Sequence, residues 1–127
     1  MRLEAELPGL SEWRRVIDWR LTQIEKLPNV TCYPSSPTSA MDILAAGFKH
    51  VFIATGATWR RDGVGRARWQ PIPGHNLACV FSPDDLLVGL LAGRFPLGRV
   101  LIFDNAHHTM GGLLAELLVS QGCRVTL

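Results

Sequence analysis

The hydrophobic pattern is clearest in the carboxyl-terminal part of the chain. Positions 99–104 form an almost continuous apolar run, positions 110–118 repeat apolar residues at helical spacing, and positions 124–127 form a second β-prone run. Strand, glycine-bearing turn, helix and strand in this order are typical of a βαβ unit, whose two strands run parallel. We therefore predict parallel α/β structure here, of the kind that opens a nucleotide-binding domain.

This unit is expected to be incomplete. In nucleotide-binding units of this type, an acidic residue that holds a ribose hydroxyl stands at the end of the second strand. The chain ends there, at Leu127. We therefore expect the sequence to be a piece of a larger oxidoreductase.

Three earlier segments carry helix signals. Apolar residues recur at helical spacing over 13–27, and we expect Ser11 to cap that helix. Ser39 and Asp42 stand three apart, as in a capping box, before a short apolar stretch. Positions 82–85 combine a hydroxyl cap, a proline in the first turn and two acids at the positive end of the helix dipole. The chain should therefore contain three helices before the βαβ unit.

Short apolar runs between these helices predict further strands. Positions 30–33 and 79–81 each combine β-branched and aromatic residues with a cysteine, and positions 49–54 form a near-continuous apolar run. A continuous apolar run is typical of a parallel strand covered on both faces. The predicted fold class is therefore α/β, with mainly parallel, Rossmann-like sheets that are incomplete.

Positions 59–74 differ in composition from the rest. They hold four arginines, three glycines, two prolines and two tryptophans without a sustained period, which indicates an irregular connection. We expect this loop to join two small half-domains, one over 1–58 and one over 75–127. The first would be the latter part of an FAD- or ADP-binding-like domain, and the second the start of an NAD(P)-binding-like domain.

Composition excludes several classes of protein. With 127 residues and 47% hydrophobic residues, the chain can bury one modest core. A formal charge of +2, with acids and bases well mixed, gives no electrostatic footprint for nucleic acid or anionic lipid. No apolar run is long enough to span a bilayer, and the first residues carry acids where a signal peptide needs an apolar core. We expect a cytoplasmic protein.

The cysteines give no metal or cluster pattern. Cys32, Cys79 and Cys123 lie far apart, whereas zinc sites and iron–sulfur clusters use closely spaced cysteines. We expect all three to be small buried residues in the reduced state. No metal site is predicted.

Thr55 and Gly56 are the first candidate ligand residues. They follow the apolar run 49–54, and ligands in open α/β sheets settle at the carboxyl ends of strands. Glycine there lets the backbone approach a pyrophosphate without a Cβ in the way. The alternative is a core strand with a tight turn, and spacing alone leaves both open.

The turn after Asp104 is the second candidate. A dinucleotide fingerprint places three glycines there, and with Glu116 as anchor they would fall at Thr109, Gly111 and Leu114, so one of the three matches. The inserted segment 105–108 lengthens the turn and would move the helix N-terminus away from a pyrophosphate. Binding of NAD or NADP is therefore doubtful, and packing is an equal alternative.

Two further groups have a functional and a structural interpretation. His107 and His108 could bind metal or move protons, but adjacent loop residues point in different directions and no carboxylate pair accompanies them. The arginines and tryptophans of 59–74 could stack on an adenine or clamp a phosphate. Such loops more often are solvated, with the tryptophans anchoring them to the core.

Five stretches together resemble one family over nearly the whole chain. They are positions 7–13, 33–37, 47–63, 82–85 and 110–116, and the run Ala-Thr-Gly-Ala-Thr-Trp at 54–59 is the most specific. On these residues the chain resembles the trimethylamine, dimethylamine and histamine dehydrogenase group, which is related to bacterial 2,4-dienoyl-CoA reductase.

The resemblance implies a place in a long flavoprotein. Members of this group have an amino-terminal (β/α)8 barrel that binds FMN and a 4Fe-4S cluster, followed by two nucleotide-fold domains, of which the first holds ADP or FAD. Nothing here matches the barrel or the first glycine-rich fingerprint. The resemblance is thus to part of an amine dehydrogenase or NADH:flavin oxidoreductase that lacks the catalytic barrel, and no cofactor is expected in the isolated chain.

Few site residues carry over by resemblance. Thr55 and Gly56 match the strand end that passes the flavin or ADP in the family. Met110, Gly111 and Gly112 match its altered second fingerprint, so Gly111 and Gly112 are the remaining cofactor-binding candidates. No residue here matches a catalytic or cluster-binding residue of the family.

Three functions remain open at this point. The first is a non-catalytic nucleotide-fold region of an iron–sulfur flavin oxidoreductase. The second is an assembly module that docks on a barrel subunit or on a second copy of itself, because isolated apolar strands leave edges and faces uncovered. The third is a small adenine-nucleotide binder that uses Gly56 and the arginine-bearing loop.

Overall fold

The computed structural model describes residues 2–127 and has one βαβ unit at its carboxyl end. Strand β1 (Arg99–Leu101) pairs in parallel with β2 (Arg124–Thr126), with Val100 opposite Val125. Helix α4 (Thr109–Ser120) connects the two strands and packs on β2. Mixed helix with a small parallel sheet confirms the α/β class.

One leucine-rich core holds this part together. Leu87 of helix α3 (Pro83–Leu91) is buried with Leu114 and Leu117 of α4. Leu7, which follows the short 3-10 helix η1 (Glu4–Glu6), is only 2% exposed in the same cluster. Leu118 is fully buried. The amino-terminal residues therefore share a core with the carboxyl-terminal half, across the expected division of the chain.

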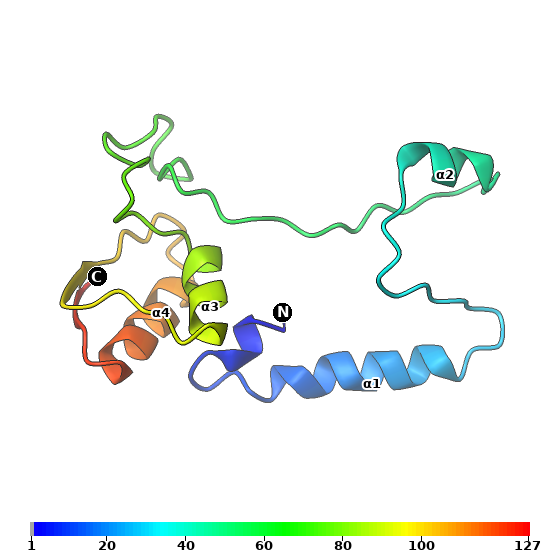
Figure 1. Ribbon diagram of the computed structural model, residues 1–127, viewed down its shortest axis with the longest axis horizontal. Helices are drawn as coiled ribbons and strands as arrows, with labels where there is room; N and C mark the ends of the chain where they lie inside the picture. Colours follow the sequence, from blue (N-terminus) through cyan, green and yellow to red (C-terminus); the bar gives the residue numbers. More distant parts are fainter. Residues whose placement is uncertain (1) are drawn as a thin grey trace.

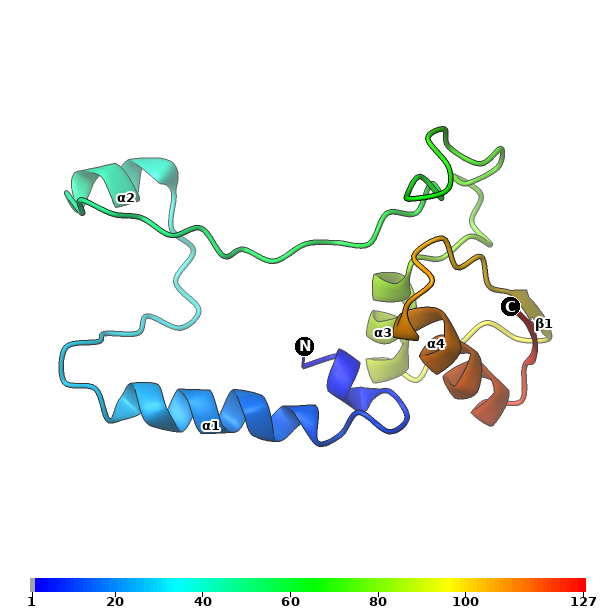
Figure 2. The same cartoon turned by 180° about the vertical axis from the view of Figure 1, so that it is seen from behind.

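The middle of the chain extends away from this core (Figures 1 and 2). Helix α1 (Trp13–Glu25) runs outward, and α2 (Ala40–Ala45) lies at the far end of the molecule. From there, a long trace without helix or strand returns to the loop above α3. Neither α1 nor α2 has a buried residue.

Three of the predicted strands are absent from the structure. Positions 30–33, 49–54 and 79–81 are neither helix nor strand, and in the described residues the one sheet is the pair β1 and β2. A strand needs a neighbour for its backbone N–H and C=O groups, and the described part of the chain offers none to these runs. Phe52 is 93% exposed as a result.

The local helix signals predicted the structure better than the strand signals did. Ser39 and Asp42 form the expected capping box of α2, and Ser82 and Asp85 form another at α3. In each, the serine Oγ accepts from the backbone N–H of the aspartate, whose carboxylate accepts from the serine N–H. Ser11 was wrong as the cap of α1, because this helix begins after Glu12 without a side-chain cap.

The cysteines differ in part from the prediction. All three are free, and Cys123 is buried with its thiol donating to the carbonyl of Pro96 at 3.1 Å. Cys32 and Cys79 are exposed instead. No described helix combines the length and hydropathy needed to cross a membrane.

Candidate functional site

One cavity lies where β1 ends and α4 begins. It has a volume of about 480 Å³. One side is built by the segment after β1 and the first turns of α4, and the other by the loop 59–74. Ligands bind in this position in open α/β sheets, which makes the cavity the candidate site.

Asp104 organises the turn between β1 and α4. Its Oδ1 accepts hydrogen bonds from the backbone N–H groups of Ala106 and His107, both at 2.9 Å. His107 has a φ of 52°, a left-handed conformation that L residues adopt at a cost. The two hydrogen bonds from Asp104 hold this turn in place.

Gly111 leaves room for the same carboxylate. A Cβ added to Gly111 would lie 2.6 Å from Oδ2 of Asp104, whereas one added to Gly112 would meet nothing within 4 Å. Gly111 is buried and Gly112 is exposed. The absence of a side chain at Gly111 therefore serves the close approach of Asp104 to the helix.

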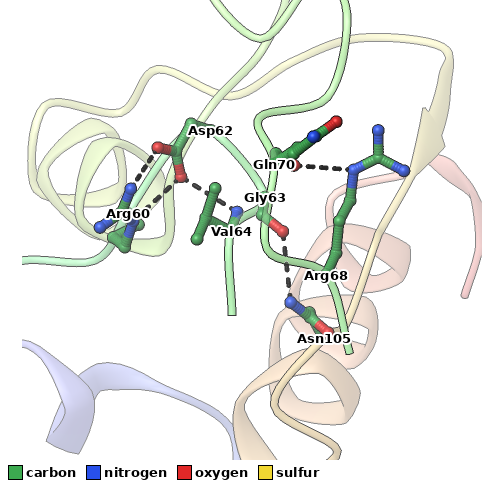
Figure 3. Close-up of polar contacts among 7 residues, drawn as sticks. All are labelled: Arg60, Asp62, Gly63, Val64, Arg68, Gln70 and Asn105. Atoms are coloured by element: carbon green, nitrogen blue, oxygen red, sulfur yellow. Dashed lines mark hydrogen bonds and ion pairs between the residues drawn. The ribbon is translucent and has the colours of Figure 1, made fainter. Parts of the chain in front are cut away.

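Asn105 fastens the loop to the turn. Its Oδ1 accepts from the N–H of Ala67 at 3.0 Å, and its Nδ2 donates to the carbonyl of Gly63 at 3.2 Å. Figure 3 shows the side chain reaching the loop from below, with the bond to Gly63 drawn. One amide side chain thus holds two points of the loop that lie four residues apart and forms one wall of the cavity.

The loop also carries its own ion pair (Figure 3). The guanidinium of Arg60 donates to both carboxylate oxygens of Asp62, at 3.1 and 2.6 Å. This hydrogen bonding, together with the N–H of Val64, lowers the pKa of Asp62 from 3.8 to about 2. The carboxylate in turn raises the pKa of Arg60. Asp62 therefore stays ionised and shapes the loop at all but strongly acidic pH.

A second contact ties the loop to α3. The backbone N–H of Trp59 donates to the Asp84 carboxylate at 2.7 Å. Trp59 lines the cavity and is 40% exposed, whereas Trp69 is 85% exposed and does not anchor the loop to the core. Of the two tryptophans expected to anchor the loop, the structure places one beside the site and the other in solvent.

The structure does not bring the predicted ligand residues together in one place. Gly111 lines the cavity, but Gly112 does not. Thr55 and Gly56 lie in the exposed extended segment, and Gly56 has a φ of 79° with open space around it. Whether any of the four contacts a cofactor stays a prediction.

Sequence reasoning missed the residues that shape the site most. Asp104 and Asn105 follow a predicted strand directly, which is a position where polar residues often face a ligand, and this was a usable signal. His108 lines the cavity and His107 does not, and both histidines are exposed. Within residues 2–127 no group of histidine, cysteine and acidic residues is arranged to hold a metal ion.

Known proteins match the chain along its whole length. It is 38% identical over 131 residues to dimethylamine dehydrogenase from Hyphomicrobium sp. (strain x), an alignment that covers 97% of the chain and 17% of that protein. It is 34% identical over 127 residues to a probable N-methylproline demethylase from Rhizobium meliloti (strain 1021), covering 100% of the chain and 17% of that protein. No family model matches.

Two solved structures have the same backbone arrangement. The 6-hydroxypseudooxynicotine amine oxidase from Pseudomonas geniculata N1 is 41% identical with a TM-score of 0.85, over 95% of the chain and 18% of that enzyme. Histamine dehydrogenase from Rhizobium sp. 4-9 is 39% identical with a TM-score of 0.82, over 98% of the chain and 19% of that enzyme. At this coverage, the likeness includes the extended middle of the chain. The chain thus spans less than a fifth of the length of these relatives.

Proposed function

Because the chain belongs, over the region that it spans, to the dimethylamine and histamine dehydrogenase group, we propose that it is a nucleotide-fold region of a flavin-dependent amine oxidoreductase and is not catalytic by itself. The observation that carries this proposal is the match along the whole chain to less than a fifth of each relative. In this proposal, 1–58 is the latter part of an FAD- or ADP-binding-like domain. The loop 59–74 connects it to 75–127, the start of a second, NAD(P)-binding-like domain.

The exposed middle of the chain supports this proposal. Phe48, Phe52 and Ile53 are 73%, 93% and 83% exposed, although their run has the composition of a buried strand. The backbone nevertheless follows that of the much longer relatives. Both observations agree if 49–54 is a strand of a sheet whose other strands belong to the rest of a larger protein. Thr55 and Gly56 would then stand at the carboxyl end of that strand, next to an FAD or ADP.

A chimera tests this proposal directly. We would replace the matching region of the Hyphomicrobium dimethylamine dehydrogenase with this chain and measure flavin content and dimethylamine-dependent reduction of an electron-acceptor dye. The matching region of the Rhizobium histamine dehydrogenase serves as the control graft. The proposal expects both chimeras to retain flavin and activity.

Two results would contradict it. In the first, the control chimera retains flavin and activity, whereas the chimera that carries this chain folds but loses both. The other is a purified 127-residue chain that carries stoichiometric flavin and oxidises an amine or NADH alone. Calorimetric titration of the isolated chain with ADP, FAD and NADH distinguishes this proposal from the alternative of a free-standing adenine-nucleotide binder. Such a binder would bind one of these nucleotides without any partner domain.

An assembly module is the second candidate, and the exposed apolar surface favours it. Trp13 and Trp19 of α1 are 50% and 64% exposed, in addition to the uncovered run at 49–54. Such a module would dock on a barrel-bearing subunit or on a second copy of itself. Light scattering over a range of concentrations tests self-association: an oligomer that Phe52→Lys dissociates supports it, and a folded monomer at high concentration contradicts it.

A further inference from the structure

We propose that the cavity between loop 59–74 and the start of α4 binds a small organic cation with a flat, apolar body, and that Asp104 is the residue that selects it. The cavity is formed by the loop together with residues of α3, the β1 end and α4, and none of its lining belongs to the exposed run 49–54. The proposal therefore goes beyond the proposed function and does not depend on a larger protein.

The Asp104 carboxylate has one oxygen, Oδ1, turned to the backbone of the turn and the other, Oδ2, beside Gly111. Within residues 2–127, both of its hydrogen bonds go to Oδ1, from Ala106 and His107. No described buried side-chain oxygen or nitrogen lacks a hydrogen-bond partner, so the remaining oxygen, Oδ2, is reached by solvent. Asp104 is also part of the cavity lining. An accessible carboxylate oxygen at a cavity wall is an acceptor for a ligand N–H group.

The negative charge of Asp104 discriminates between anionic and cationic ligands. A dinucleotide phosphate at this turn would approach the N–H groups of the first turn of α4, and it would meet the like charge of the Asp104 carboxylate, which lies beside Gly111 of that turn. A cation meets an opposite charge instead. The charge of the carboxylate therefore opposes a phosphate and favours a cation at this turn.

Three basic side chains also line the cavity. Arg60 is paired with Asp62, so its charge is largely compensated. Arg66 and His108 also line the cavity, and both Arg66 and the positive end of the α4 dipole oppose a bound cation. We therefore expect weak binding, with dissociation constants of the order of millimolar.

The remaining walls of the cavity bear on the shape and polarity of the ligand. Most of the lining is hydrophobic or glycine, and it includes two aromatic rings. The larger hydrophobic and aromatic members are Trp59, Val64, Ile102, Phe103, Met110 and Leu114. Aromatic rings attract organic cations as well as apolar bodies. Benzamidinium, a flat ring with a planar cation that can donate two parallel hydrogen bonds to a carboxylate, is therefore a suitable probe.

The experiment compares benzamidinium with its neutral analogue benzamide and with pyrophosphate, by ¹H–¹⁵N NMR titration of the 127-residue chain. We expect saturable binding of benzamidinium about tenfold tighter than that of benzamide, as for one hydrogen bond to a charged group. Asp104→Asn should remove this difference. Glu116→Gln is the control, because Glu116 is an exposed carboxylate on α4 outside the cavity lining, and this variant should retain the difference.

Four results would overturn the proposal. They are equal binding of benzamide and benzamidinium, an unchanged difference in Asp104→Asn, tighter binding of pyrophosphate than of benzamidinium, and no saturable binding up to about 20 mM. If Asp104→Asn does not fold, the titration of the parent chain still decides. Its shifted amides should lie at 63–66 and 103–111, and shifts centred elsewhere would also overturn the proposal.

Discussion

Positions 51–54 and 100–103 are two apolar runs of the same length that end in different structures. The second run contains most of β1, with the N–H of Ile102 donating to the carbonyl of Thr126 at 2.8 Å. The first run has no ladder, and its Phe52 is 93% exposed. The composition of the two runs is alike, so the difference comes from what the rest of the chain supplies.

The run at 100–103 has a neighbour that the same chain delivers. Helix α4 returns the chain to β2, and its Leu118 is fully buried. The run at 51–54 is flanked by α2, which has no buried residue, and by a loop that packs on the other half of the molecule. A β-prone sequence therefore forms a strand only when a partner strand is available, and this depends on non-local contacts.

The sharpest test of this comparison is a pair of large-to-alanine substitutions. Leu118→Ala should destabilise the chain by about 3 kcal/mol, because it opens a cavity in the core. Phe52→Ala should change the free energy of unfolding by less than about 0.5 kcal/mol, since the side chain is almost fully exposed. Urea denaturation followed by circular dichroism measures both. Comparable losses in the two variants would mean that 51–54 is packed in solution.

Two neighbouring glycines of α4 offer a second test, within the well-packed region of the molecule. Gly112→Ala should stabilise by about 0.5–1 kcal/mol, because alanine is the better helix former and open space surrounds the site. Gly111→Ala should instead destabilise by about 1 kcal/mol, since its Cβ would push Asp104 out of the turn that it holds. The midpoints of urea denaturation distinguish the two. In an Asp104→Ser background, Gly111→Ala should lose this penalty, and a penalty that persists would contradict the assigned role of Gly111.

The elements that sequence predicted well are those with short-range causes. Each capping serine bonds with an aspartate three residues on; the capping box at Ser39 and the serine cap at Ser82 were both predicted. The βαβ order was also read within one continuous stretch. The pairing of 49–54 was not predictable in this way, because the neighbours of a strand can come from anywhere in a chain.

The candidate site shows the same limit. The contacts of Asn105 join residues 38 and 42 positions apart, and the fold of loop 59–74 has no periodic signal. The glycine fingerprint drew attention to Gly111 as a pyrophosphate position. The structure shows it beside the Asp104 carboxylate, a contact that the fingerprint does not predict.

The two capping boxes give a third prediction, because the same motif occurs once in each region. Ser82 is buried at the start of α3, which packs on the core, so Ser82→Ala should cost about 1 kcal/mol in the free energy of global unfolding. Ser39→Ala should melt the exposed helix α2 without moving the midpoint of global unfolding. Hydrogen exchange of the α2 and α4 amides separates local from global effects. A loss of protection in α4 on Ser39→Ala would show that the two regions unfold together.

The smallest expected effect is the pH dependence of loop 59–74, which joins the two regions. The pKa of Asp62 is lowered from 3.8 to about 2, first by the hydrogen bonds from Arg60 and then by the N–H of Val64. A depressed pKa in the folded state means that the ionised form supports the loop above the ordinary value, and that this support is lost as the pH falls from about 4 to about 2. The Val64 amide signal should titrate with a midpoint near that lower value, and Asp62→Asn should abolish this titration. The Leu118 amide is the control for the core: if both amides moved together, the loop would be reporting acid unfolding of the whole molecule and not its own carboxylate.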